Sequence, residues 1–301
     1  MTDSRTRKII LITVAVAAVI IAAVAGFSAS GKRGNDIEET HPVPVNLNGT
    51  LTNEMSDTSC LAGFDKIVKD YLTYWGIHGA SLSVMRNDSL LFAKGYGEAD
   101  TGKKMGPGNI LRMASVSKLV TAVGIMVLQE RGLLSIKDHV FGPDGILNDS
   151  TYNAAIKDTL YYRITVEDLL RHKGGFSKRG GDPMFSTRWI MMQNGWKEVP
   201  TQEQLMELQL KRRVKFVPGT AQEYSNFGYL ALSMVIEKVS GTDYETFMQE
   251  NVLRPIGCVD FHIAGNYYKH KLPNETRYYV QHDDEPAEEF NNSGRKVTRC
   301  Y

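Results

Sequence analysis

The chain has 301 residues, of which 42% are hydrophobic and 23% are charged, a composition typical of a globular protein with one large domain or two small ones. Its 35 basic and 34 acidic residues leave a formal net charge of +1, which excludes a strong positive field, so we expect no nucleic-acid partner. The three cysteines and seven histidines show no metal-ligand spacing, and we expect neither a metal site nor another cofactor.

An uncharged apolar segment near the N-terminus predicts insertion into a membrane. Residues 9–27 carry no charged side chain, and Arg5, Arg7 and Lys8 precede them. The segment is about long enough to span a bilayer, and positive charge before a span favours a cytoplasmic N-terminus. We therefore expect residues 1–8 in the cytoplasm, a single-pass anchor at 9–27 and an exported body. Cleavage of the segment as a signal peptide, which would give a secreted protein, stays open.

The next part of the chain predicts a linker, a helix and a hairpin. Residues 28–58 are rich in Gly, Asn, Thr, Pro and acidic residues and lack a helical period, which is typical of a linker. The folded body is then expected at 59–301. It begins with apolar side chains at helical spacing, which stop at Gly76. Two β-prone runs follow within residues 79–100, separated by Arg-Asn-Asp-Ser, which predicts a hairpin.

Residues 112–132, RMASVSKLVTAVGIMVLQERG, predict a helix with a reactive pair at its start. Ser115 and Lys118 are three positions apart and so share one helix face. Residues 119–128 are apolar nearly all round, which predicts a central, buried helix. Burial favours a neutral lysine amine that could take the serine proton. Alternatively, Ser115 caps the helix and Lys118 extends to solvent.

Further helices are expected at 164–176, 201–216 and 225–241, mostly closed by glycine. His172 lies near the end of the first of these, and we expect it to cap helix carbonyls and not to act as a base. Residues 178–207 are the expected wall of a substrate pocket.

Tyr224 and Asn226 form a second candidate pair before the helix at 225–241. Positions two apart in an extended stretch project to the same side, so Tyr224 could relay protons while Asn226 binds a substrate amide. Alternatively, Tyr224 packs under the loop and Asn226 caps a helix that begins at Phe227.

Three blocks of the chain are similar to the class C β-lactamase and penicillin-binding-protein-like serine hydrolases. They are residues 110–140, 164–176 and 216–257, within a resemblance that covers roughly residues 80–263. The resemblance implies an α/β (α+β) fold of the β-lactamase/transpeptidase type, with an antiparallel sheet flanked by helices and an all-helical region. It also implies Ser115 as the acyl-accepting nucleophile, Lys118 as its base partner, Tyr224 as proton relay and Asn226 as a substrate-binding residue.

The third motif of this family has no counterpart after Asn226. Family members carry Lys or His followed by x-Gly on a strand that supplies an oxyanion donor, and no K-x-G or H-x-G occurs between Phe227 and Tyr301. We therefore expect the C-terminal strands to be lacking, in a truncated product or a degenerate member. The expected function is a membrane-anchored, exported serine hydrolase acting on peptide, ester or β-lactam-like carbonyl substrates through an acyl-enzyme. The alternative is a non-catalytic, membrane-bound binding or scaffold protein.

Overall fold

The computed structural model describes residues 51–179, 182–265 and 270–279. Residues 1–8, the apolar segment 9–27 and most of the predicted linker lie outside this part of the chain. Among the helices that the structure describes, none combines the length and the apolar character needed to cross a bilayer.

The sheet of the described residues has three antiparallel strands in the order β1–β2–β3. The strands are β1 (Gly79–Arg86), β2 (Ser89–Asp100) and β3 (Lys103–Lys104). Asn87 and Asp88 connect β1 to β2 with φ angles of 47° and 58°, the left-handed conformation that tight hairpin turns require. The predicted hairpin is therefore confirmed.

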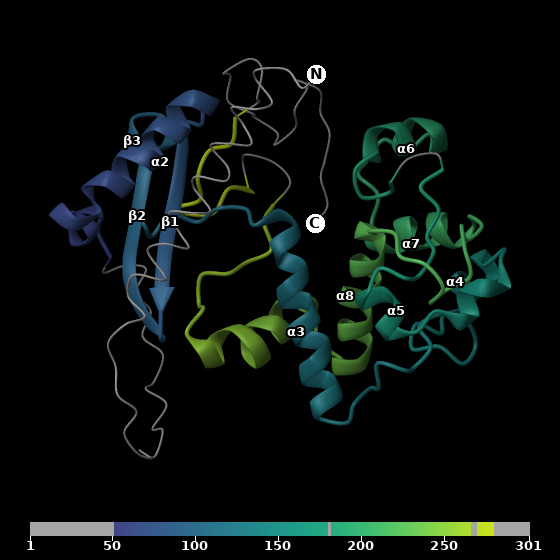
Figure 1. Cartoon of the computed structure of the whole chain (residues 1–301). Coiled ribbons are helices and arrows are strands. Elements are labelled where there is room, and N and C mark those ends of the chain that lie inside the picture. The colour runs from purple at the N-terminus through teal and green to yellow at the C-terminus, as the bar shows by residue number, and fades with distance from the viewer. Residues whose placement is uncertain (1–50, 180–181, 266–269, 280–301) are drawn as a thin grey trace, which may run out of the picture. The chain divides into compact units, whose positions relative to one another are not determined.

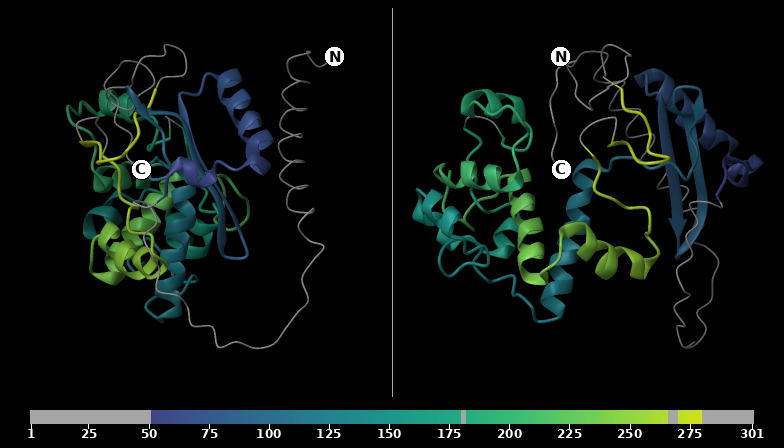
Figure 2. Two further views of the ribbon diagram at one scale, coloured as in Figure 1. Left: turned by 90° about the vertical axis from the view of Figure 1, so that its left-hand side faces the viewer. Right: turned by 180° about the vertical axis from the view of Figure 1, so that it is seen from behind.

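Helix α2 (Ala62–Trp75) covers one face of this sheet, as Figures 1 and 2 show. Its Phe64, Val68 and Leu72 pack against Phe92 and Tyr96 of β2. The helix ends at Gly76, as predicted, where φ is 60°. The other side chains of the predicted apolar face remain exposed, namely Ile67, Tyr71 and Trp75.

A 3-10 helix, Asn53–Ser56, lies against β2 although it falls within the range predicted as linker. The Ser56 hydroxyl accepts a hydrogen bond from Ala93 N at 3.0 Å, and Asn53 Oδ1 accepts one from Gly95 N at 2.8 Å. These side chains satisfy strand groups that would otherwise lose hydrogen bonds on burial. The folded body thus begins before residue 59.

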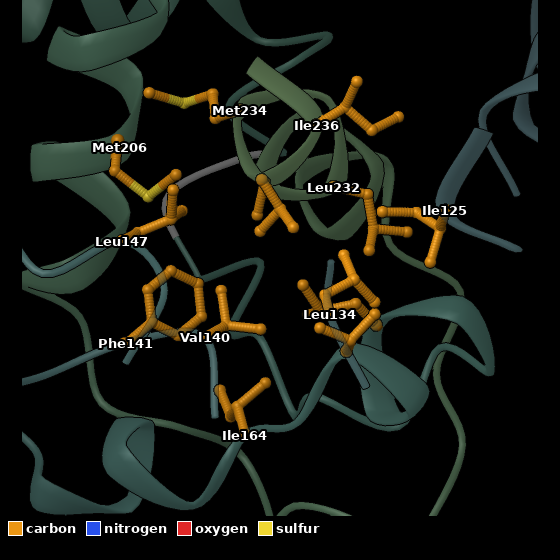
Figure 3. Packing of buried hydrophobic residues seen from close by; sticks show 14 of the residues in the cluster. Ile125, Leu134, Val140, Phe141, Leu147, Ile164, Met206, Leu232, Met234 and Ile236 are labelled. Atoms are coloured by element: carbon orange, nitrogen blue, oxygen red, sulfur yellow. The ribbon is translucent and has the colours of Figure 1, made fainter. Parts of the chain in front are cut away.

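The remaining helices form the all-helical region, and the α+β architecture predicted from the resemblance is confirmed. Their side chains bury a continuous core, which Figure 3 shows around Phe141, Leu232 and Ile236. Threonine capping boxes begin two of the helices, α5 and α7. The helices are α3 (Ser117–Glu130), α4 (Ser150–Ala155), α5 (Val166–Leu170), α6 (Thr187–Asn194), α7 (Gln202–Leu210), α8 (Asn226–Ser240) and α9 (Tyr244–Met248), which continues as a π-helix over Gln249–Leu253.

We predicted a central, buried helix, but within the described residues α3 is buried on one side only. Ile125 and Leu128 on its inner side are fully buried. A Cβ atom at Gly124 would lie 2.6 Å from the Met248 sulfur, which shows how closely α9 approaches this side. The opposite side exposes a row of apolar side chains, Leu119, Val123 and Met126. Apolar composition predicted a core helix, but the described elements cover just one face.

Residues 270–279 pack back against the segment that leads from the sheet to Ser115, and Glu275 forms an isolated β-bridge with Ile110. Glu275, which is 2% exposed, accepts a hydrogen bond from Arg112 Nε at 3.3 Å. The backbone of Thr276 donates to Ile110 O at 2.9 Å, and Arg277 N donates to Ala99 O at 2.7 Å. These contacts fix the chain three residues before the predicted nucleophile.

Candidate active site

Ser115 lies in a short 3-10 helix, Ala114–Val116, immediately before α3. Ala114 has a φ of 47°, a left-handed conformation that residues with a Cβ rarely adopt and that is typical of functional sites. The N-cap of α3 is Val116, and no side chain caps the helix there. Ser115 therefore does not cap α3, and it is exposed to solvent.

The structure brings the four predicted site residues into one hydrogen-bonded network. The Ser115 Oγ lies 2.6 Å from the Tyr224 hydroxyl oxygen. Lys118 Nζ lies 3.2 Å from Ser115 Oγ and donates to Asn226 Oδ1 at 2.9 Å. Ser115 lies just before α3 and Lys118 lies in its first turn, whereas Tyr224 lies just before α8 and Asn226 is its first residue. A proton can therefore move between the serine, the lysine and the tyrosine without rearrangement of the backbone.

The electrostatics of the network act on Tyr224. Burial by itself raises the pKa of its phenol, but hydrogen bonds with Lys118 and Ser115 and the positive charge of Lys118 outweigh burial, so the pKa is lowered. Lys118 Nζ also lies 5.0 Å from the ring centre of Tyr224 and 5.7 Å from that of Tyr229. Tyr224 is 43% exposed, so part of this residue is open to solvent.

Helix α8 begins in a way that frees Asn226 for the network. The Ser225 hydroxyl caps the helix by accepting from Gly228 N at 3.1 Å. Asn226 is thus the first helical residue and not the cap. Its side chain faces Lys118 instead, so the capping alternative for Asn226 is wrong.

His172 contacts the ring of Tyr224 and the backbone of the next residue, Ser225. Its Nδ1 accepts a hydrogen bond from Ser225 N at 3.2 Å, and its ring centre lies 4.5 Å from that of Tyr224. Burial and the positive charges of Lys118 and Lys178 lower the pKa of the imidazole. An Nδ1 that accepts places the proton of the neutral ring on Nε2. His172 therefore acts on the segment before α8, whereas we predicted that it caps helix carbonyls.

Asp182 is a member of the network that the sequence analysis missed. Its Oδ2 accepts from Asn226 Nδ2 at 3.1 Å, and its Oδ1 accepts from Met184 N at 2.9 Å. It lies within the predicted pocket wall, but no motif marks it, since an aspartate in a loop is commonplace. Within the described ranges, no group of three or more His, Cys, Asp or Glu side chains is arranged to hold a metal ion.

Comparison with known proteins places the chain in a family. The family model described as Beta-lactamase matches residues 64–296. The chain therefore belongs to the Beta-lactamase family, and the resemblance seen in its motifs is confirmed.

Among its curated relatives is the D-alanyl-D-alanine-carboxypeptidase/endopeptidase AmpH of Escherichia coli (strain K12), 27% identical over 201 residues, with 64% of this chain and 47% of the relative covered. A penicillin-binding protein of Bacillus subtilis (strain 168) is 24% identical over 188 residues, with 62% of this chain and 37% of the relative covered. The chain thus spans less than half the length of either relative.

A solved structure shows the same fold. The octameric penicillin-binding protein homologue from Pyrococcus abyssi superposes with a TM-score of 0.53 at 21% identity, over 80% of this chain and 52% of that chain.

Proposed function

We propose that this protein is a serine hydrolase that forms an acyl-enzyme on Ser115. The observation that carries the proposal is the network in which Ser115 Oγ lies 2.6 Å from the Tyr224 oxygen and 3.2 Å from Lys118 Nζ. A serine hydroxyl is a weak nucleophile until a nearby base takes its proton, and both candidate bases are within reach.

The reaction begins when Ser115 Oγ adds to a carbonyl carbon and its proton passes to the neutral amine form of Lys118 or to the phenolate form of Tyr224. The same proton moves on to the leaving group as the carbon–leaving-group bond breaks, which leaves an ester on Ser115. Water then cleaves this ester and releases the acid. Asn226 binds the substrate, and the backbone N–H of Ser115 donates to the developing oxyanion.

The substrates in this proposal are peptides, esters or β-lactam-like compounds whose carbonyl group can acylate a serine. Family membership and the names of the curated relatives support this class. The motifs around Ser115 and Tyr224 contain no residue pattern that would position the water for cleavage of the acyl-enzyme. This favours peptidase or esterase activity over rapid β-lactam turnover.

We also propose that residues 9–27 anchor the protein in a membrane, with a linker between this segment and the folded body and with the hydrolase body on the exported side. The uncharged segment and the basic residues before it support this arrangement. Extraction of cell membranes at alkaline pH tests the anchor, because an integral protein stays with the pellet. Release into the supernatant would count against a spanning segment.

Covalent labelling tests the catalytic proposal. A fluorescent fluorophosphonate or penicillin is expected to label the protein, and Ser115→Ala is expected to abolish the label. Ser117→Ala is a matched control, because this serine begins α3 two residues away and lies outside the network. Equal labelling of the wild type and Ser115→Ala would refute the assignment.

A further inference from the structure

The amide of Asn226 is held at both of its ends. Its Oδ1 accepts from Lys118 Nζ at 2.9 Å, while its Nδ2 donates to Asp182 Oδ2 at 3.1 Å. Lys118 and Asp182 come from α3 and from the segment before α6, so three separate parts of the chain meet at this one side chain.

The two contacts select the same orientation of the amide. After a half-turn about its last bond, the Nδ2 hydrogens of Asn226 would face the hydrogens of Lys118, and Oδ1 would face the Asp182 carboxylate. Both charge-assisted hydrogen bonds would be lost and replaced by repulsion. Each such bond shifts the balance between the two orientations by about 10- to 100-fold.

Asp182 is itself anchored, so it imposes an orientation and does not merely follow one. Its second oxygen, Oδ1, accepts from Met184 N at 2.9 Å, in the local turn that aspartate commonly forms with the backbone two residues on. Since one carboxylate oxygen is committed to the backbone, the other presents an acceptor to Asn226 in a fixed direction.

We propose that Asp182 is a positioning residue for the chemistry at Ser115. Its carboxylate fixes the Asn226 amide with Oδ1 on Lys118, and this in turn fixes Lys118 Nζ beside Ser115. One Nδ2 hydrogen of Asn226 then remains for the substrate. The inference rests on the proposed hydrolase function and assigns Asp182 a role that depends entirely on Asn226.

A double-mutant cycle tests this dependence. The measured quantity is the second-order rate constant for labelling by a fluorophosphonate in the 301-residue protein. Asp182→Ala is expected to lower it by about 10- to 100-fold. The double variant Asp182→Ala with Asn226→Ala is expected to label within about twofold of Asn226→Ala alone, because a residue that acts through a second one has no effect once the second is gone.

A serine at position 182 separates positioning from loop stability. Asp182→Ser keeps a hydroxyl that can accept from Met184 N, but it is too short to reach Asn226, so its labelling rate should fall as in Asp182→Ala while its Tm stays near that of the wild type. Asp149→Ala is a matched control, because Asp149 also accepts from a backbone N two residues on, Thr151 N at 2.8 Å, at the start of α4. It should leave the labelling rate unchanged.

Two failures are distinguishable. If the wild type takes no Ser115-dependent label, the proposed function fails. If the wild type is labelled on Ser115 but Asp182→Ser is labelled at the same rate, or if the losses from Asp182→Ala and Asn226→Ala multiply in the double variant, then the role of Asp182 is overturned and the hydrolase proposal stands.

Discussion

The hydroxyl oxygens of Ser115 and Tyr224 lie 2.6 Å apart although 109 positions separate the two residues in the sequence. Ser115 lies in the 3-10 helix two residues before α3, and Tyr224 lies two residues before α8. The contact therefore depends on how these two helices pack. The shared proton can be bound to either of the two oxygens.

Replacing Tyr224 with phenylalanine removes the phenol oxygen but keeps the ring that packs on His172. We expect the labelling rate of Ser115 to fall by about 10²- to 10⁴-fold, the usual contribution of a positioned acid or base. Stability should change little, since Tyr224 is 43% exposed. Tyr229→Phe is the control, because its hydroxyl donates to Leu170 O at 3.1 Å and serves the fold. Comparable rate losses in both variants would remove the special role of Tyr224.

Titration of the tyrosines provides a separate check of the electrostatics. Among the described tyrosines whose pKa departs clearly from 10.0, Tyr224 alone has a lowered pKa. The pKa values of the others are raised. In Tyr152, for example, burial raises the pKa to about 12. The first ionisation seen by ultraviolet difference absorbance on raising the pH should therefore vanish in Tyr224→Phe. In Lys118→Met it should move to higher pH, because the positive charge and its hydrogen bond are gone. An unchanged first ionisation in Tyr224→Phe would contradict the assignment.

His172 predicts a pH dependence of stability. Its pKa in the folded protein is lowered from the ordinary 6.5, so the unfolded chain binds the proton more readily than the folded one. The stabilisation is present above pH 6.5 and is lost as the pH falls through the lowered value. His172→Gln, which can still accept from Ser225 N, should show a smaller drop in Tm between about pH 7.5 and pH 5. Parallel curves for variant and wild type would refute this linkage.

The two sides of α3 predict opposite responses to truncation. Leu128 is fully buried, and Leu128→Ala is expected to cost about 2–5 kcal/mol of unfolding free energy through lost burial and a cavity. Leu119 is 69% exposed, and Leu119→Ala should change stability by less than about 0.5 kcal/mol. Chemical denaturation measures both. A large loss in Leu119→Ala would mean that other parts of the protein cover this side in solution.

Much of the fold could be predicted from local sequence patterns. The turn at Asn87 and Asp88, the glycine stop at Gly76 and the helices after Ser115 and Tyr224 each depend on neighbouring residues. The candidate site was predictable for a related reason, since Ser115 and Lys118 share one turn of chain. Only the meeting of this pair with Tyr224 and Asn226 needed the family resemblance or the tertiary structure.

The remaining features depend on contacts that no local pattern records. The apolar side chains around α3 show that each of its sides could be buried. They do not show which side the neighbouring elements cover, and Leu119 is left exposed. Asn53 and Ser56 look like linker residues, yet their side chains bond the backbone of β2. Asp182 becomes part of the site through a single long-range hydrogen bond, which its own neighbours in the sequence do not predict.

Helices α3 and α8 contribute Ile125, Leu128 and Leu232 to the larger of the two hydrophobic clusters formed by the described residues. The residues expected to react are therefore attached to helices of this cluster, while most of the predicted pocket wall, residues 178–207, belongs to other segments. Asp182, within that predicted wall, accepts a hydrogen bond from Asn226, so the wall and the reacting residues are linked through this contact. A substitution at this point of the wall is therefore expected to alter reactivity as well.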